Sequence, residues 1–325
     1  REWPIPFIRL FSRGITMVFL IVLAVFAFLF LLSTLIIYFF VFYTPVKNQN
    51  DVMRPMSGPN YAKYSKETND LIKELLAKKC EMVYIKSRDG LKLEARYYES
   101  EKKDTPIAIC AHGYRGTSIR DFCGGSKLLS SLGMSLLLIS ERGCMGSEGH
   151  TVTFGVKEKT DILDWVEYVK KRKGENASIY LMGVSMGAHT VLTVASSLSG
   201  NNVRGIIADC PYTSSLSIIE SVMAKKHFPH WLFYPLVKAS SSIWGAFHLT
   251  REGAVESVKN ASIPILIIHG TKDNLVPYTM SEEIYNANKD KVKLVEVEGA
   301  DHALSYMVDN KLYIESVKEF VSSTR

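Results

Sequence analysis

The hydrophobic pattern of the chain begins with a long apolar stretch, because residues 15–43 carry no charged side chain. A helix of about 20 apolar residues crosses the hydrocarbon core of a bilayer. The apolar core of a cleavable signal peptide is shorter, about 7 to 15 residues, and a small-residue cleavage site follows it. Neither feature is seen here, and a buried core helix is the less favoured alternative. The pattern therefore predicts a transmembrane anchor over residues 15–43.

Basic residues flank this stretch on both sides. Arg9 and Arg13 precede it and favour a cytoplasmic N-terminal segment over residues 1–14. Lys47 and Arg54 follow it closely and weaken that bias. With the N-terminus inside, the rest of the chain lies outside the cytoplasm, tethered to the membrane.

Residues 44–80 are expected to be a linker followed by a short helix. The turn-forming residues of the first part include Pro45, Pro55, Gly58 and Pro59. Between residues 61 and 79 apolar side chains recur at helical spacing among many lysines, at Leu71, Ile72, Leu75 and Leu76. This helix is expected to lie along the globular domain or along the membrane surface.

A mostly parallel sheet is predicted for residues 81–325. Residues 81–100 alternate about Asp89-Gly90, which indicates an antiparallel hairpin at its start. Helical stretches, notably 160–173 and 186–198, then alternate with short apolar runs. These runs cover residues 107–111, 135–139, 179–182, 203–208, 263–268 and 292–297. In such sheets ligands bind at the carboxyl ends of the strands.

The composition narrows the class of protein. A chain of 325 residues with 47% hydrophobic residues can bury a large core. The net charge of +6 is modest and its basic residues are spread along the chain, so nucleic acid is not an expected partner. The five cysteines show no metal-ligand spacing, and neither structural zinc nor a disulfide framework is expected.

The clearest chemical motif is Gly-x-Ser-x-Gly, with Ser185 between Gly183 and Gly187. An apolar strand precedes it and helical spacing follows it. The two glycines lack the Cβ that would block a sharp strand-to-helix reversal, so Ser185 can be exposed on a strained turn. This arrangement predicts a nucleophile elbow.

An acid and a base follow the serine in chain order. Asp273 and His302 each come just after a predicted strand, in the order Ser, Asp, His. A serine hydroxyl needs a base, which His302 can supply near neutral pH, and Asp273 would hold the imidazole in the right tautomer. We therefore predict Ser185, His302 and Asp273 to be nucleophile, base and acid.

Other polar residues near the strand ends compete for these roles. Asp209 also ends an apolar strand and is the alternative acid, although Cys210-Pro211-Tyr212 behind it suggests a structural turn. His112 and His269 each precede the glycine of a turn, which favours packing or support of the site. His189 is expected to point away from the site, and Asp301 to lie at the surface.

The loop after residues 107–111 reads His112-Gly113-Tyr114-Arg115-Gly116. Its glycines permit a tight turn that aims a backbone N–H into the site, and a tetrahedral intermediate needs two such donors. The backbone N–H groups of Tyr114 and Met186 are the predicted oxyanion hole. The alternative is a plain glycine turn.

Residues 214–259 form an insertion between two core strands that fits no sheet pattern, and we expect a lid. Its aromatic and aliphatic residues, such as Trp231 and Phe233, are numerous enough to line an apolar pocket above Ser185. Alternatively, they only pack the insertion onto the core. Its basic residues can face anionic headgroups, or simply solvent.

These motifs carry a family resemblance. Residues 81–324 resemble the α/β-hydrolase superfamily, in particular membrane-anchored bacterial cell-surface hydrolases and serine-aminopeptidase-like hydrolases. The motifs in family order are His112-Gly113-Tyr114, Gly183-Val184-Ser185-Met186-Gly187, Asp209-Cys210-Pro211-Tyr212, Gly270-Thr271-Lys272-Asp273 and Gly299-Ala300-Asp301-His302. The resemblance implies the α/β-hydrolase fold and the same three catalytic residues. One loop departs from the pattern, because Cys144 and Met145 stand where relatives commonly have His and Gly.

The expected protein is a membrane-anchored serine hydrolase of α/β-hydrolase fold, with no cofactor or metal. It would cleave esters or thioesters with an apolar acyl part through an acyl-enzyme. A peptidase or amidase acting on small peptides is the alternative enzyme, since the same triad serves both. A non-catalytic membrane-tethered binding protein that kept the fold is the alternative from another class.

Overall fold

The computed structural model describes residues 5–45, 58–102 and 104–324, with side chains from Ile15 on. The basic residues expected to orient the anchor, Arg9, Arg13, Lys47 and Arg54, therefore lie outside the residues whose side chains are described. So does most of the expected linker.

An eight-stranded sheet organises the globular part, in the order β1-β2-β4-β3-β5-β6-β7-β8. Its strands are β1 (Glu81–Lys86), β2 (Lys92–Tyr98), β3 (Ile107–Ala111), β4 (Ser135–Ile139), β5 (Ile179–Val184), β6 (Val203–Asp209), β7 (Ile265–Gly270) and β8 (Val292–Val297). β2 runs antiparallel to β1 and β4, and the other pairs are parallel. The predicted hairpin about Asp89-Gly90 is present, with Gly90 at a φ of 94°.

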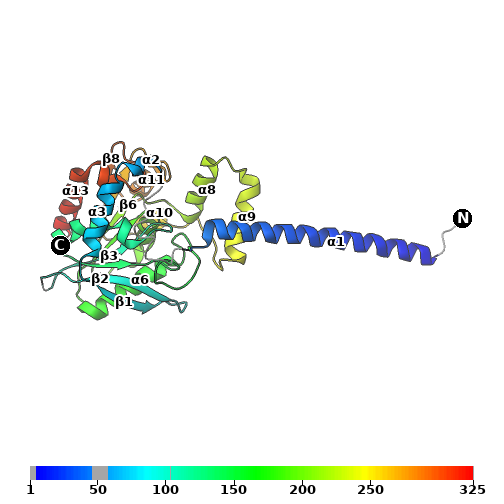
Figure 1. Ribbon diagram of the computed structural model, residues 1–325, viewed down its shortest axis with the longest axis horizontal. Helices are drawn as coiled ribbons and strands as arrows, with labels where there is room; N and C mark the ends of the chain where they lie inside the picture. The colour runs from blue at the N-terminus through cyan, green and yellow to red at the C-terminus, as the bar shows by residue number, and fades with distance from the viewer. Residues whose placement is uncertain (1–4, 46–57, 103, 325) are drawn as a thin grey trace.

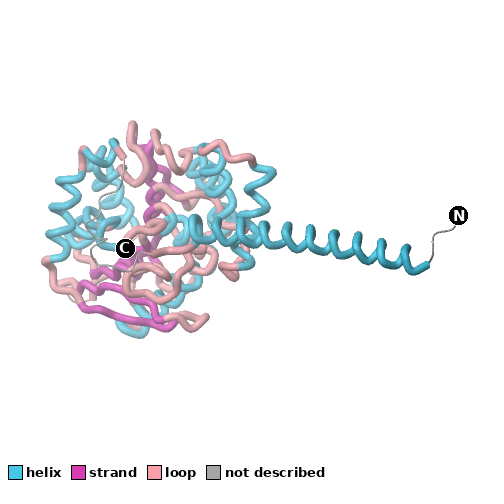
Figure 2. The backbone as a smooth tube through the Cα atoms, turned by 45° about the vertical axis from the view of Figure 1, so that its right-hand side comes forward, coloured by secondary structure: helices cyan, strands magenta, loops and turns pink. Residues whose placement is uncertain are grey.

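Helices cover both faces of this sheet, as Figure 2 shows from the side. One face carries α6 (Glu158–Lys173), α7 (Met186–Thr193), α10 (Ala254–Lys259) and α11 (Thr279–Ala287). The other carries α3 (Ser65–Leu76), α4 (Ser118–Asp121), α5 (Cys123–Ser131) and α13 (Asn310–Ser323). Strands β3, β5 and β7 are buried along their whole length, as expected for parallel strands covered on both sides. This is the α/β-hydrolase fold implied by the resemblance.

The predicted helices differ from the observed ones mainly at their ends. α6 begins at Glu158, two residues before the expected start. The helix expected over 186–198 stops at Thr193, and a short 3-10 turn, Ala195–Ser197, replaces its last part. The helix expected between residues 61 and 79 is α3, and the short α2 (Pro59–Ala62) precedes it.

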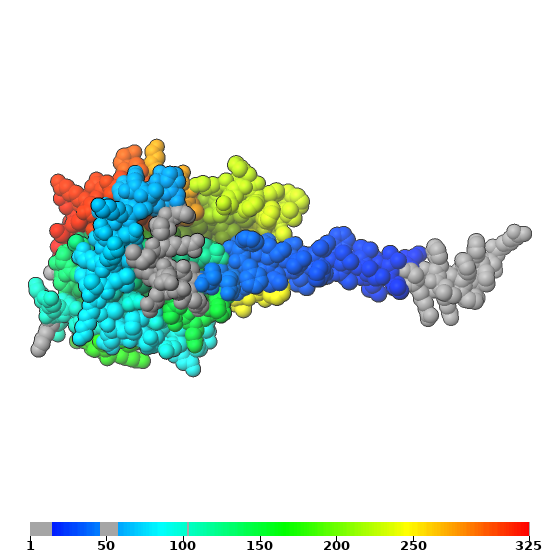
Figure 3. Space-filling model, in the orientation of Figure 1, coloured from blue at the N-terminus to red at the C-terminus, as the bar shows by residue number. Residues whose placement is uncertain are grey.

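A long helix, α1 (Ile5–Ile37), projects from the globular part (Figures 1 and 3). It continues into a π-helical turn, Tyr38–Phe42. Within it, Ile15–Phe42 is the one span among the described residues that is long and apolar enough to cross a membrane. Most of its apolar side chains are exposed, whereas Phe42 at its end is fully buried. Length and composition of this kind are typical of a membrane anchor or of a signal sequence.

The insertion between β6 and β7 forms α8 (Ser215–Lys225) and α9 (His230–Ile243) before α10 joins the sheet layers. A capping box of Ser214 and Ser217 begins α8. Figure 1 shows α8 and α9 on the side of the globular part from which α1 projects. α9 packs against α1, and Trp244 Nε1 donates a hydrogen bond to Thr34 Oγ1 at 3.0 Å.

Candidate active site

Ser185 lies at the turn between β5 and α7, with φ 55° and ψ −113°. A non-glycine residue adopts this strained conformation only where its surroundings enforce it. The glycines on either side permit close packing: a Cβ on Gly183 would lie 2.3 Å from Gly187 C, and one on Gly187 would lie 1.9 Å from the Ala111 carbonyl oxygen. The turn therefore has the form predicted for a nucleophile elbow.

A chain of hydrogen bonds joins the three predicted residues. Ser185 Oγ lies 2.9 Å from His302 Nε2, and His302 Nδ1 lies 2.7 Å from Asp273 Oδ2. The donors follow from this geometry: the serine hydroxyl donates to Nε2, and the Nδ1–H donates to the carboxylate. Ser185 and His302 are nearly buried, at 9% and 5% exposure, so little water competes for these bonds.

Asp273 is held as an anion by its neighbours. Burial alone would raise its pKa, but hydrogen bonds from His269 and His302 hold the pKa well below its usual value. Its other oxygen, Oδ1, accepts hydrogen bonds from the backbone N–H of Leu275 and Val276, both at 2.7 Å. A permanent carboxylate at this position fixes the His302 ring and stabilises the imidazolium that would form during reaction.

His269 forms a hydrogen bond with Asp273, which fits the supporting role expected from the sequence. Its Nε2 lies 3.1 Å from Asp273 Oδ2, and its Nδ1 lies 2.6 Å from Ser281 Oγ. The ring is fully buried. It therefore orients the acid rather than contacting the serine.

Asp209, the competing acid, lies under the site without a hydrogen bond to His302 among the described residues. Its backbone carbonyl accepts from Ser185 N–H at 2.8 Å, and its Oδ1 accepts from Ser305 Oγ at 3.3 Å. Burial raises its pKa to about 6, although His269 and His302 oppose the change. The carboxylate that reaches the imidazole is that of Asp273.

The loop after β3 lies against the serine. A Cβ on Gly113 would be 3.5 Å from Ser185 Cβ. Gly113 N–H donates to Asp121 Oδ2 at 2.9 Å, and His112 Nδ1 donates to the Gly113 carbonyl at 2.8 Å. Within the described residues, the backbone N–H groups of Tyr114 and Met186 have no acceptor. This leaves both predicted oxyanion donors unused by the fold.

His112 and His189 lie away from the serine, as expected, whereas Asp301, which was expected at the surface, contacts the His302 loop. His112 Nε2 accepts from Glu141 N–H at 3.0 Å, deep under the loop. His189 is buried on α7, stacks on Tyr212 and bonds to its carbonyl at 2.9 Å, away from the serine. Asp301 is half-buried, and its Oδ1 accepts from the backbone N–H of His302 at 2.8 Å, so it helps to hold that loop.

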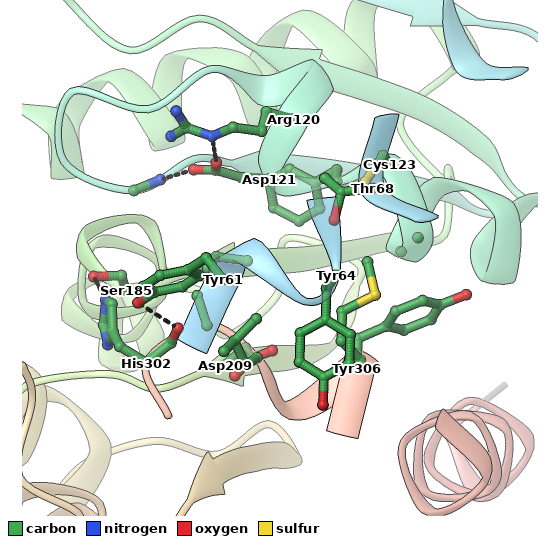
Figure 4. A pocket seen from close by; sticks show the side chains of 18 of the residues that line it. Tyr61, Tyr64, Thr68, Arg120, Asp121, Cys123, Ser185, Asp209, His302 and Tyr306 are labelled. Atoms are coloured by element: carbon green, nitrogen blue, oxygen red, sulfur yellow. Dashed lines mark hydrogen bonds and ion pairs between the residues drawn. The ribbon is translucent and has the colours of Figure 1, made fainter. Parts of the chain in front are cut away.

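A cavity of about 190 Å³ opens beside Ser185 and His302 (Figure 4). Its lining includes Tyr61, Tyr64 and Thr68 from α2, α3 and the turn between them, together with Tyr306 and Met307 from α12 (Ser305–Val308). The Tyr61 hydroxyl donates to the His302 carbonyl oxygen at 3.0 Å, and Figure 4 shows its ring beside the Ser185–His302 pair.

None of the described lining comes from the insertion, so the expectation that Trp231 and Phe233 line the pocket is wrong. Trp231 is 78% exposed on α9 instead. The insertion's buried side chains pack with the end of α1, around Phe42, Phe154 and Phe247. The lining residues that the sequence did not predict include Tyr61, Tyr64, Thr68 and Ile72. Their spacing of three and four residues was the available signal, but they are divided between two helices and the turn that joins them.

One group near the site also has metal-ligand atoms close together. Cys210, Asp273 and His302 offer such atoms within 4.8 Å of one another. Asp273 and His302 already bond to each other, and burial raises the pKa of the Cys210 thiol, which keeps it protonated. Since a metal needs the thiolate, this donor set suits the hydrogen-bonded relay better than an ion.

Comparison with known proteins agrees with this geometry. Residues 127–324 match the model of the prolyl oligopeptidase family. The chain belongs to this family. Its fold is also that of the Pyrococcus furiosus esterase Pf2001, with a TM-score of 0.62 and 23% identity over 77% of this chain and 95% of that one. The protein is thus a serine hydrolase of the α/β-hydrolase type.

Two relatives match over much of the sequence. The uncharacterized protein YqkD of Bacillus subtilis is 26% identical, over 70% of this chain and 74% of its own. The lysophosphatidylserine lipase ABHD12 of Danio rerio is 26% identical, over 61% of this chain and 52% of its own. The matched region therefore spans only about half of that lipase.

Proposed function

We propose that this protein is a membrane-anchored hydrolase that cleaves carboxylic esters or thioesters with an apolar acyl part. The observation that carries the proposal is the continuous relay from Ser185 through His302 to Asp273, beside a largely apolar cavity. We assign these three residues as nucleophile, base and acid. The backbone N–H groups of Tyr114 and Met186 are the proposed oxyanion hole.

The reaction follows from this assignment. Ser185 Oγ attacks the acyl carbon while His302 takes its proton, and the Tyr114 and Met186 N–H groups stabilise the oxyanion. His302 then gives the proton to the leaving alcohol or thiol, which leaves an acyl-enzyme. Water, deprotonated by the same imidazole, releases the acid and restores the serine.

The cavity lining favours an ester over a peptide with a free amino terminus. Among its described lining residues only Asp121 and Asp209 carry carboxyl groups. Asp121 is occupied by Arg120 Nε at 3.0 Å and by Gly113 N–H. Asp209 is buried, with only 4% of its surface exposed, and its Oδ1 already accepts a hydrogen bond from Ser305 Oγ. Neither carboxyl group is well suited to bind an ammonium ion, and the names of the esterase and lipase relatives point the same way.

Membrane attachment is proposed from the span Ile15–Phe42 and from the exposed aromatic surface beside it. Phe228, Trp231 and Leu232 are exposed on the insertion, whose helix α9 packs against α1. Such a surface is unfavourable in water and suits the interfacial zone of a bilayer. We keep the proposed orientation with residues 1–14 in the cytoplasm and the domain of residues 81–325, with its insertion 214–259, outside.

The test uses the full-length protein in nanodiscs with a fluorophosphonate probe. One equivalent of probe should label Ser185, and Ser185→Ala should abolish labelling and lower kcat by up to about 10⁶. Labelling that persists in the Ala variant contradicts the nucleophile. A wild-type protein that neither labels nor turns over esters or amides supports the non-catalytic alternative.

Two matched variants and two substrate classes complete this test. Asp273→Asn should fold but lose about 10⁴ in kcat, because the His302 tautomer is no longer held. Asp209→Asn should keep most activity, and the reverse result would transfer the acid role to Asp209.

Aminoacyl amides should be cleaved far more slowly than acyl p-nitrophenyl esters of similar size. Faster amide cleavage would favour the peptidase.

A further inference from the structure

The end of the anchor helix is built into the globular domain. Phe42 is fully buried, and its ring meets those of Phe154 and Phe247 edge-on, with centroids 6.0 and 5.3 Å apart. Val152 N–H donates to the Phe42 carbonyl at 2.8 Å, and Thr44 N–H donates to the His150 carbonyl at 2.9 Å. The anchor is therefore held by both side chains and backbone.

Two residues of the loop after β3 supply donors to the same helix end. The last carbonyls of a helix have no partner within it. Arg115 Nη2 donates to the carbonyls of Phe40 at 3.1 Å and Phe39 at 3.3 Å, and also contacts that of Tyr43. The Tyr114 hydroxyl donates to the Val41 carbonyl at 2.7 Å. This loop thus caps the anchor.

The capping residues belong to the loop assigned to the oxyanion hole. Tyr114 carries one of the two proposed N–H donors on its backbone. Its ring stacks on Phe154 at 5.0 Å, and the Arg115 guanidinium lies 4.9 Å from the ring centroid. Arg115 has a φ of 49°, a conformation that a non-glycine residue keeps only when its surroundings hold it. The anchor's carbonyls are part of those surroundings.

We propose that the docked end of the anchor positions the oxyanion loop, so that the membrane helix is part of the catalytic apparatus as well as a tether. Arg115 and the Tyr114 side chain are positioning residues, since they act through the Tyr114 N–H. The inference rests on the proposed function, because it needs an oxyanion at Ser185. Loss of one oxyanion donor costs about 10² to 10³ in rate, and a displaced donor should cost part of that.

The experiment compares Arg115→Gln and Tyr114→Phe with wild type, all full-length in nanodiscs. Arg88→Gln, which removes the ion pair between the exposed Arg88 and Asp164, is the matched control for the charge. Trp244→Phe, which removes the separate bond from the insertion to Thr34, is the control for anchor docking away from the loop. Each variant is assayed on a soluble acyl ester and on its thionoester, whose sulfur is a weaker hydrogen-bond acceptor than oxygen.

Both loop variants should lower kcat for the ester about 10- to 100-fold, leave KM within about twofold, and lower the thionoester rate much less. Both controls should stay within about twofold of wild type on both substrates. General damage to the fold would lower the two rates together. Hydrogen exchange of residues 112–117 should also rise in the loop variants.

The inference is overturned if Arg115→Gln and Tyr114→Phe keep the wild-type kcat, or lose ester and thionoester activity equally. Should Arg115→Gln fail to fold, Tyr114→Phe, which removes a single hydroxyl group, decides alone. Absence of fluorophosphonate labelling at Ser185 in the wild type is a separate result that overturns the proposed function itself.

Discussion

Two helical segments outside the sheet, α2–α3 and the α8–α9 insertion, differ in where their aromatic residues lie. The lysine-rich segment of α2 and α3 turns Tyr61, Tyr64 and Thr68 toward the cavity beside Ser185. The more apolar α8–α9 insertion contributes none of the described lining and leaves Trp231 exposed on α9, the helix that packs against α1. The lysine-rich α2–α3 segment therefore lines the cavity, whereas the apolar α8–α9 insertion does not.

The difference teaches that apolar content alone does not locate a substrate pocket. In a water-soluble protein an apolar insertion is expected to find cover on the core or over a ligand. Beside the proposed membrane span, the lipid itself can provide that cover. α3 packs on the sheet layers through Ile72 and Leu75, and its Thr68 and Ile72 also line the cavity.

The largest effect in this comparison is expected from a substitution on α3, which tests whether this helix lines the cavity. Thr68→Trp should fill part of the cavity and lower kcat/KM for a p-nitrophenyl octanoate about 10- to 100-fold, because a single misfit methylene already costs about 1 to 3 kcal/mol. The acetate ester should lose little. Steady-state kinetics on the full-length protein for C2 to C12 esters measures both.

The matched variant on the other segment is Trp231→Ala, which should leave the chain-length profile unchanged. In wild type and in this variant, kcat/KM should rise with chain length, by up to about 0.8 kcal/mol per methylene, until the cavity is full. A profile that flattens in Trp231→Ala and survives in Thr68→Trp would reverse the roles of the two segments.

A smaller effect concerns the floor of the cavity, at Asp209. Its folded-state pKa, about 6, lies above the ordinary value because of burial. Its contribution to stability is therefore full below about pH 4 and is lost as the pH rises through about 6. Asp209→Asn should remove this loss, so that its Tm exceeds that of wild type by several degrees at pH 8 but not at pH 4. Thermal unfolding in nanodiscs at the two pH values measures the difference.

Glu220→Gln is the corresponding control on the insertion. Glu220 pairs with the exposed Arg251 at 2.6 Å, and a surface ion pair contributes at most about 1 kcal/mol. Its Tm change should be small at both pH values. An Asp209→Asn variant whose Tm difference from wild type is the same at pH 4 and pH 8 would contradict the burial of this carboxyl group.

The smallest expected effect tests whether the exposed surface of the insertion contacts lipid. Brominated lipids quench tryptophan fluorescence at short range, so Trp231→Phe should reduce the quenching of the full-length protein in brominated nanodiscs. Its kcat should stay within about twofold of wild type. Quenching equal to that of wild type would place the exposed surface away from lipid.

The fold could be predicted from the sequence, and the three candidate catalytic residues could be proposed from it, because their signals are local. Gly183 and Gly187 mark the elbow around Ser185, and Asp273 and His302 each follow a short apolar strand that the sheet places beside it. Backbone connectivity alone brings such positions to one edge. The hydrogen bonds at His302 agree with that prediction.

The sequence did not predict the pocket wall or the capped anchor, because both depend on contacts between distant segments. Tyr61 reaches His302, and Arg115 reaches Phe39 and Phe40, across long separations in the chain. From the sequence alone, Arg115 is indistinguishable from a surface residue in a glycine-containing turn. Only the folded arrangement reveals that its donors meet carbonyls at a helix end.

The burial of Phe42 has a consequence for how the hydrolase could be released from the membrane in which we propose that it is anchored. A protease that cuts the chain between residues 46 and 57 severs the covalent tether but leaves Phe42 in its aromatic pocket. Exposing a phenylalanine side chain costs about 1.5 to 3 kcal/mol, and the backbone pairing with Val152 adds to that. Shedding by proteolysis would therefore yield a nicked enzyme that stays on its helix.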